Sequence, residues 1–293
     1  MKNKELPIGI ILLSILLLIT FIGPHLPFID TEFEEGRMRY NSETKEFSRA
    51  PHPPSSDDWF GTDEEGRDIF SLIILGAKDT LYFMLAATFI KYLMAVPLGL
   101  LARKGKGIIY SFLSTWSSVF SGLPIIIMGI ILFKMPIFMT ANNRFLLIVF
   151  VVSLLEVGRV GMVFQQLAGR ISTKPYIEAS ITMGSKPLQI VWGHYLPVLL
   201  PEILVSFILN LGRMALLVGQ LGVFKIFLSF QIYVMGTPPL VNTSYNWGSL
   251  LGDAKDNILR ATWIPLFPAL AITYVIFTFN LLGEGLRKKL VRA

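Results

Sequence analysis

The chain has 293 residues, of which 53% are apolar and only 16% are charged, and its mean hydropathy is +0.60. A soluble domain carries about a quarter charged residues, so this composition excludes a water-soluble globule and predicts an all-α, polytopic membrane protein. The net charge of +6 favours basic anchoring loops over a nucleic-acid partner. The absence of cysteine excludes disulfides and thiolate metal sites, and no HExxH or GxxxxGK[ST] motif indicates a metal centre or an ATPase.

Six apolar segments are long enough to cross the hydrocarbon core, which requires about 20 helical residues. They are Leu6–Pro24, Thr80–Ala102, Ile108–Phe133, Phe145–Phe164, Val198–Phe224 and Ala261–Leu282. The first segment is not followed by an A-x-A-like cleavage site, so it is interpreted as an uncleaved span rather than a signal peptide. Six spans place both termini on the same side of the membrane.

The basic residues predict which side that is. The short segments that share a side with the termini are rich in lysine and arginine, whereas the long segment from about residue 25 to 79 contains more acids than bases. The positive-inside rule therefore places both termini in the cytoplasm. The basic residues on the inner side are Lys2, Lys4, Arg103, Lys104, Lys106, Arg170, Lys174, Lys186, Arg287, Lys288, Lys289 and Arg292.

The outer segment Asp30–Asp58 is polar and contains the run RAPHPPSSDD near its end. This density of proline and serine predicts an extended, poorly ordered connector outside the membrane. A contact surface for an external partner is the alternative.

A partly polar stretch, YIEASITMGSKPLQIVWGHYLP, lies between the fourth and fifth spans on the cytoplasmic side. Ser172 or Thr173 is expected to cap a helix that has Pro175 in its first turn, and Gly184 is expected to end it in the left-handed conformation. Ser185 and Pro187 then begin a second helix. A helix of about ten residues is too short to be stable alone in water, which indicates a soluble partner that holds it.

This stretch resembles the EAA loop of ABC importer permeases, E-A-A, three residues, Gly, nine residues, then I-x-L-P. Glu178, Ala179, Gly184, Leu196 and Pro197 match, whereas Ser180 replaces the second alanine and His194 replaces the apolar residue. In that family the loop is a coupling helix that docks into a separate ATP-hydrolysing subunit. The resemblance implies an ATPase-coupling role for Tyr176, Glu178, Ala179, Gly184 and Pro197.

A second stretch, FGTDEEGRDIFSLIILGAKDTL, resembles the GTDxxGRD signature of one of the two permeases in dipeptide, oligopeptide and nickel ABC importers. NWGSLL and FPALAITYVIFTFNLLGEGLRKKL resemble the last loop, last span and tail of that subunit. Departures lie in Gly222–Trp247, where Pro238 and Pro239 are retained, and in ARKGKG. The matching signature residues at the entry to the second span are Gly61, Thr62, Asp63, Gly66, Arg67 and Asp68.

The resemblance implies a type-I permease fold with four parts. These are an N-terminal transmembrane helix (1–28), an extracytoplasmic loop (29–75), a five-helix permease core (76–284, with the coupling loop at 164–197) and a cytoplasmic tail (285–293). It implies a multi-pass subunit of a bacterial plasma membrane, and its partners would be a second homologous permease, two cytoplasmic ATPase subunits, an extracytoplasmic substrate-binding protein and membrane lipid. ATP and Mg²⁺ would bind to the ATPases and no cofactor to this chain. The implied cargo is a short peptide, with nickel or a metal chelate as the alternative.

Charged residues within the spans include Lys91, Arg213, Glu156 and Arg159, and the first two admit two interpretations each. Lys91, near the middle of the second span, and Arg213, in the fifth, either line the substrate pathway and attract a carboxylate or are buried against an acid or carbonyls. Glu156 and Arg159 are three residues apart on one helix face, which indicates an ion pair near the cytoplasmic boundary.

Other functions have less support in the residues. The signature's Arg67, Asp63 and Asp68 favour helix capping and salt bridges over acid–base chemistry. A secondary transporter would show inverted repeats or an intramembrane acid relay, and an intramembrane enzyme would show paired aspartates, a Ser-Lys pair or HExxH. The sequence shows none of these.

Overall fold

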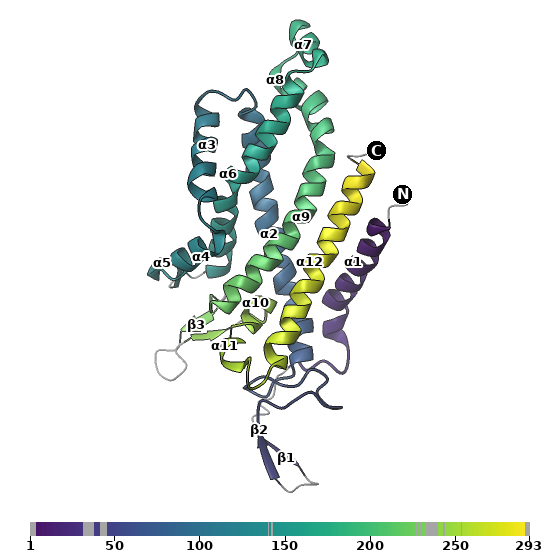
Figure 1. Cartoon of the computed structure of the whole chain (residues 1–293), viewed down its shortest axis with the longest axis vertical. Helices are drawn as coiled ribbons and strands as arrows, with labels where there is room; N and C mark the ends of the chain where they lie inside the picture. Colours follow the sequence, from purple (N-terminus) through teal and green to yellow (C-terminus); the bar gives the residue numbers. More distant parts are fainter. Residues whose placement is uncertain are drawn as a thin grey trace. The chain divides into compact units, whose positions relative to one another are not determined.

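The computed structural model describes residues 4–31, 38–41, 46–139, 141, 143–226, 228, 230–232, 240–242, 244–252 and 254–290. Long helices dominate this part of the chain (Figure 1). Five are long and apolar enough to cross a membrane, and a bent pair supplies a sixth span if it is counted as one. The predicted all-α, polytopic architecture is confirmed.

The helices follow one another as long spans and short connecting turns. The long ones are α1 (Glu5–Phe21), α2 (Ile69–Leu101), α3 (Ile108–Ser121), α6 (Arg144–Ser172), α9 (Leu196–Val223) and α12 (Trp263–Leu290). The short ones are a 3₁₀ turn (Gly23–His25), α4 (Ile125–Phe133), α5 (Pro136–Met139), α7 (Pro175–Thr182), α8 (Pro187–Ile190), a π turn (Val191–Tyr195), α10 (Trp247–Leu250) and α11 (Ala254–Asn257).

The predicted third span, Ile108–Phe133, is not one straight helix. It is divided into α3 and α4, whose axes differ by 86°. Pro124 precedes α4 and is extended, with ψ 131°, and the residue before a proline is disfavoured in helical conformation. Hydropathy is continuous through the break, which is why the apolar pattern alone predicted an unbroken span.

Two antiparallel hairpins complete the described secondary structure. β1 (Met38–Asn41) pairs with β2 (Glu46–Arg49), inside the segment that the sequence predicts to be a poorly ordered connector. β3 (Phe230–Ile232) pairs with β4 (Leu240–Asn242), inside the region that departs from the family pattern. Pro238 and Pro239 lie outside the described residues.

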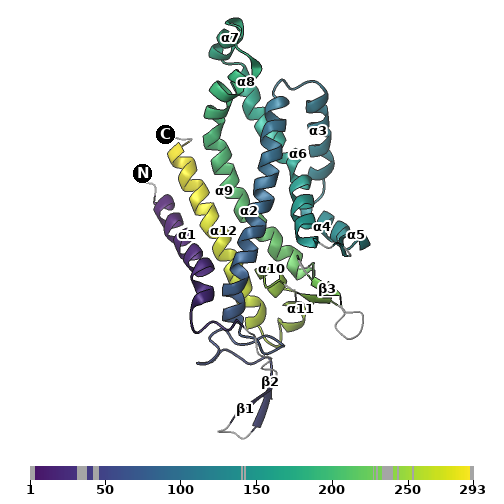
Figure 2. The same cartoon turned by 180° about the vertical axis from the view of Figure 1, so that it is seen from behind.

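The chain divides into two compact units, and the boundaries fall within α1, α2, α9 and α12. Unit 1 contains Met1–Ile8, Leu85–Leu211 and Asn280–Ala293, and unit 2 contains Gly9–Met84 and Gly212–Phe279. In unit 1, the start of α1 and the end of α12 lie toward the same end of the helices as α7 (Figures 1 and 2). This agrees with the expectation that the termini and the EAA-like loop share a side.

Glycines allow the helices of unit 1 to approach closely. A Cβ atom at Gly99 in α2 would lie 2.6 Å from the carbonyl oxygen of Gly161 in α6. A Cβ at Gly158 would lie 2.6 Å from the backbone nitrogen of Ser117 in α3. Small residues at such crossings are how membrane helices gain packing, since lipid offers no hydrophobic driving force between them.

In unit 2, α10 is anchored to the start of α2. Trp247 is buried and donates from its indole Nε1 to the carbonyl oxygen of Ile73 over 2.7 Å. A Cβ at Gly76 would lie 2.0 Å from the carbonyl oxygen of Tyr245, so glycine is required there. The NWGSLL motif therefore has a packing role against the second span.

Candidate functional site

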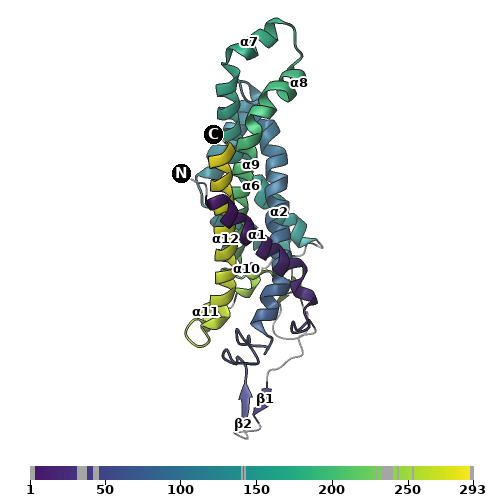
Figure 3. The same ribbon diagram turned by 90° about the vertical axis from the view of Figure 1, so that its right-hand side faces the viewer.

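The EAA-like loop folds as a short helix that projects from unit 1. α7 begins at Pro175 and ends before Gly184, which has the predicted left-handed backbone with φ +82°. Figure 3 shows α7 and α8 beyond the ends of the unit 1 helices. The predicted stop at Gly184 is confirmed.

The predicted caps of this loop are wrong. Lys174 occupies the N-cap position of α7 and Lys186 that of α8. Ser172 and Thr173 instead donate back to the carbonyl oxygens of Ala168 and Arg170, extending α6. Serine and threonine compete with capping in this way when a carbonyl of the preceding turn is within reach.

The inner face of α7 is fixed by a hydrophobic cluster. Ile177 is 1% exposed and packs among residues from the ends of α2, α6, α8 and α9. We call this set the Ile177 cluster: Leu100, Ala168, Ile171, Ile177, Ile190, Tyr195 and Leu199. A displacement of α7 would therefore be transmitted to the ends of three transmembrane helices.

Polar contacts reinforce this anchor. The Ser180 hydroxyl lies 3.0 Å from His194 Nε2 and donates to the carbonyl oxygen of Tyr176. The Ser172 and Tyr195 hydroxyls lie 2.8 Å apart, joining the end of α6 to the π turn. Ser180 and His194, the two departures from the EAA pattern, thus contact each other, which sequence reasoning did not foresee.

The outer face of α7 is apolar and exposed. Tyr176, Ile181 and Met183, which we call the outer face of α7, are 44%, 60% and 78% exposed. Glu178 and Ala179 are exposed beside them. Exposed apolar surface on a short projecting helix is typical of a protein–protein contact.

The remaining loop residues lie around this face. Gly184 is at the turn, and Pro197 lies in the first turn of α9, directly after the π turn. A proline lacks the N–H of a regular helix, so a local departure from α-geometry is expected beside it. Leu188 and Trp192, which the motif does not single out, are 67% and 64% exposed.

The GTDxxGRD-like signature forms a structural turn in unit 2. Asp63 accepts hydrogen bonds from the backbone N–H groups of Glu65 and Arg67, and its carboxylate pairs with the Arg67 guanidinium at 2.7 Å. Asp68 caps α2 by accepting from the backbone N–H groups of Phe70 and Ser71. Helix capping and salt bridging, which the sequence favoured over acid–base chemistry, therefore account for Asp63, Arg67 and Asp68.

Two glycines give the turn its shape. Gly61 and Gly66 have φ +72° and +83°, and a Cβ at Gly61 would lie 2.7 Å from the His52 carbonyl oxygen. Thr62 is fully buried, and its carbonyl oxygen accepts from the Trp263 indole. The signature thus joins the entry of the second span to the start of α12.

Burial and charge perturb the turn's ionisable groups. Burial raises the pKa of the Glu65 carboxyl above its usual range, and the nearby Asp63 adds to this. Although burial alone would lower the pKa of the Arg67 guanidinium, the charge of Asp63 raises it. Arg67 therefore remains a permanent cation in this turn.

Unit 1 also contains a cluster of charges within its helices. Lys91 is fully buried and donates from Nζ to Glu156 Oε2 over 2.5 Å and to Asn210 Oδ1 over 3.2 Å. Asn210 in turn donates to the Tyr92 hydroxyl over 2.6 Å. Of the two interpretations of Lys91, pairing with an acid is the one that the structure displays.

Glu156 and Arg159 form the predicted ion pair, but not at the helix boundary. α6 extends from Arg144 to Ser172, so Glu156 is near its middle. The predicted fourth span ended at Phe164 and therefore placed the pair too close to an end. Glu156 thus joins Lys91 and Arg159 deep within the span.

Arg213 lies in α9, in unit 2, and its side chain is exposed. Within the described residues it has no hydrogen-bond or ion-pair partner. A charge at the centre of a lipid-facing helix costs roughly 2.5–3.5 kcal/mol on insertion scales. Its exposed face is therefore expected to contact water or a second protein.

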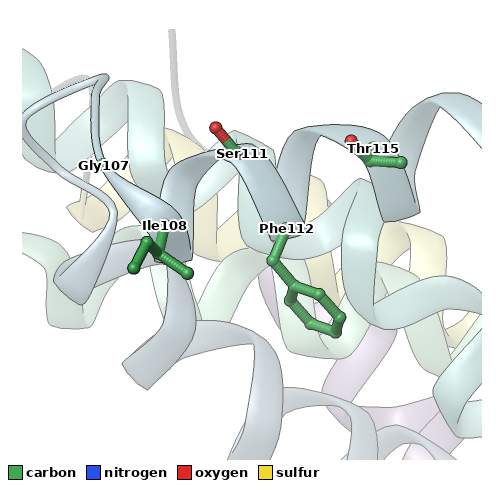
Figure 4. A pocket seen from close by; sticks show the side chains of 5 residues that line it. All are labelled: Gly107, Ile108, Ser111, Phe112 and Thr115. Carbon is green, nitrogen blue, oxygen red and sulfur yellow. The ribbon is translucent and has the colours of Figure 1, made fainter.

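Two hollows adjoin these elements in unit 1. One of about 600 Å³ lies beside the start of α3 and is lined by Gly107, Ile108, Ser111, Phe112 and Thr115 (Figure 4). None of these lining side chains is ionisable, so this hollow has no side-chain charge to pair with a charged cargo. The other, of about 210 Å³, lies beside the α3–α4 break and includes Glu156 and Arg159.

Within the described ranges, no group of three or more histidine, aspartate or glutamate side chains is placed so that it could hold a metal ion. The arrangement is instead that of a multi-helix membrane component with a projecting loop. Comparison with known families agrees: a family described as binding-protein-dependent transport system inner membrane component matches residues 95–293. The chain belongs to this family, and its fold is that of a type-I importer permease.

Relatives match almost the whole chain. The dipeptide transport system permease protein DppC of Bacillus subtilis is 30% identical over 99% of this chain and 82% of that protein. The oligopeptide transport system permease protein OppC of the same organism is 27% identical over 99% and 86%. The glutathione transport system permease protein GsiD of Pectobacterium atrosepticum is 28% identical over 86% and 79%.

Proposed function

We propose that this chain is a non-catalytic permease subunit of an ABC importer of short peptides. It would lie in a bacterial plasma membrane with both termini and α7 in the cytoplasm. The names of the relatives, which refer to dipeptides, oligopeptides and glutathione, support a peptide cargo. The basic residues beside α7 and at the chain ends support the orientation.

The proposed partners supply what this chain lacks. ATP and Mg²⁺ would bind to two cytoplasmic ATPase subunits, because the chain has no phosphate-binding loop motif. A second homologous permease would complete the pathway, and the exposed Arg213 supports a neighbour on α9. An extracytoplasmic substrate-binding protein would deliver the peptide.

The observation that carries the coupling role is the two-sided character of α7. Its outer face is exposed and apolar, whereas Ile177 and Ser180 on its inner face are buried. An ATPase bound to the outer face of α7 would displace α7 when it changes conformation. The packing of the Ile177 cluster would transmit that displacement to α2, α6 and α9. The transmembrane helices would then change between two states to which the ATPase binds with different affinity.

A charge on the outer face of α7 tests this role. Met183→Arg places a cation in the apolar contact, so we expect loss of ATPase-subunit binding, peptide uptake and peptide-stimulated ATP hydrolysis. Leu259→Arg is the matched control, since Leu259 is 97% exposed and one candidate span, Pro187–Val223, lies between it and α7 in the chain. This control should retain the ATPase subunits when the complex is purified.

Two outcomes would contradict the proposal. Normal uptake with Met183→Arg would remove the coupling role of α7. Uptake of ⁶³Ni²⁺ without uptake of labelled trialanine by the wild-type transporter would replace the peptide with a metal cargo.

A further inference from the structure

Arg159 stands out among the charged residues of unit 1 because it is both deep in a span and accessible. It lies near the middle of α6, yet its side chain is 42% exposed. It lines the hollow of about 210 Å³ beside the break between α3 and α4. Lipid is a costly neighbour for a guanidinium at this depth, so the hollow is expected to hold water or a polar ligand.

The charge balance leaves the hollow positive. Lys91 binds Oε2 of Glu156, and Arg159 binds Oε1 of the same carboxylate. Two cations therefore share one anion, and because Lys91 is fully buried the excess charge is presented through Arg159. A ligand of the hollow would be an anion.

The chemistry of arginine indicates which kind of anion would bind in the hollow. A guanidinium has five donors in a planar fork that matches a carboxylate, and here Nη2 donates to Glu156. Glu156 is the one partner of Arg159 within the described ranges, so donors remain for a second carboxylate. The Lys91–Glu156 pair would hold the fork in place.

We propose that Arg159 binds the C-terminal carboxylate of the peptide as it crosses the membrane. This deepens the proposed function and rests on it. The hollow is walled by apolar residues of α3, α4 and the break between them, among them Phe120, Leu123 and Met128, and Ser121 adds a hydroxyl. One cation in an apolar wall favours a peptide C-terminus over a solute with several negative charges. The single carboxylate charge is then compensated by Arg159, and no further charge is left unpaired in the hollow.

The test compares a peptide acid with its amide. Cells that express the complete transporter, with this chain as wild type or variant, are supplied with labelled trialanine or trialanine amide. Arg159→Gln should lower trialanine uptake about tenfold, the worth of one charge-assisted hydrogen-bond pair. Uptake of the amide, which lacks the carboxylate, should change less than about twofold.

Two further variants keep the result decisive. Lys134→Gln removes an equal charge from an exposed position of unit 1 and should leave both uptakes unchanged. Arg159→Lys keeps the charge but loses the planar fork of the guanidinium. If Arg159→Gln does not accumulate in the cells, Arg159→Lys serves instead, and its ratio of amide uptake to trialanine uptake should be higher than that of wild type.

An equal loss for both peptides, or no loss for either, would overturn the carboxylate site. Wild-type cells that import neither peptide would instead overturn the proposed function itself, so the two failures are distinguishable.

Discussion

Two side chains that depart from the EAA pattern, Ser180 and His194, are hydrogen-bonded to each other at 3.0 Å. Each replaces a residue that the pattern has as apolar, so the two changes together exchange an apolar contact for a polar one. A buried polar group is stabilised only while its partner is present. The pair therefore joins α7 to the π turn in a way that either change alone would not.

We expect this pair to behave non-additively on mutation. Ser180→Ala or His194→Leu alone should each lower the stability of the purified complex, because the remaining polar group loses one hydrogen bond, although Ser180 keeps its bond to the Tyr176 carbonyl oxygen. Ser180→Ala with His194→Leu should recover about 0.5–1.5 kcal/mol of the summed loss, since the contact becomes apolar on both sides. Thermal unfolding of the four proteins measures this, and strictly additive losses would show that the two side chains are independent.

Residue-level prediction was best where the backbone requires a particular amino acid. The left-handed φ of Gly184 was predicted, and Asp68, which caps α2, is one of the three charged residues for which capping or salt bridging was predicted. The contact between Lys91 and Glu156, 65 residues apart, depends on how α2 and α6 pack. The sequence left open whether Lys91 lines the substrate pathway or is buried against an acid or carbonyls, and it did not identify Glu156 as the partner.

At the scale of elements, the turn after α7 determines how the loop reverses. Gly184 has no heavy atom within 4 Å of an added Cβ, so its conformation, not space, is the constraint. Gly193 in the π turn also has nothing within 4 Å but has no left-handed φ. The two glycines are thus a matched pair that differ in backbone conformation.

Alanine substitutions at Gly184 and Gly193 should show how much the left-handed backbone conformation matters, because alanine fits the available space at both positions. Gly184→Ala should destabilise the complex by about 1–2 kcal/mol, the cost of a left-handed non-glycine residue, and should reduce peptide uptake. Gly193→Ala should be neutral or slightly stabilising, since alanine favours helix. Unfolding temperatures and uptake rates measure the difference, and equal effects of the two changes would refute a role for the backbone conformation of Gly184.

Element boundaries reveal where hydropathy is insufficient. α2 begins at Ile69, whereas the predicted span began at Thr80, because capping by Asp68 starts the helix while polar residues are still present. The α3–α4 break was missed because every residue from Ile108 to Phe133 is uncharged. Apolar length measures the tolerance of a segment for lipid, but proline and capping chemistry determine where helices stop.

At the scale of the whole molecule, the order of spans and motifs was predictable, because each is encoded within a short stretch. Lateral packing was not, since it depends on close approaches such as that of Gly99 to Gly161. The exposed Arg213 and the exposed outer face of α7 indicate contacts with other subunits. A single subunit of an assembly leaves such surfaces unexplained until its partners are considered.

The orientation of the molecule is the premise on which the coupling role depends, and the chain is well suited to test it. It contains no cysteine, so one introduced thiol reports on one position. Met183 and Leu259 are both highly exposed, and one candidate span, Pro187–Val223, lies between them in the chain. Opposite sides of the membrane should therefore be labelled at the two positions.

When this chain is expressed without the ATPase subunits, which would cover Met183, a membrane-impermeant maleimide should label Leu259→Cys in cells whose cytoplasmic membrane is intact. It should label Met183→Cys only after that membrane is permeabilised. The cysteine-free parent measures background labelling, and full labelling of both variants in detergent shows that neither thiol is hidden. Because an ATPase acts only where ATP is present, α7 can be its contact only if Met183→Cys is protected in intact cells. The reverse pattern would place α7 outside and exclude the coupling role, whatever the effect of other variants on uptake.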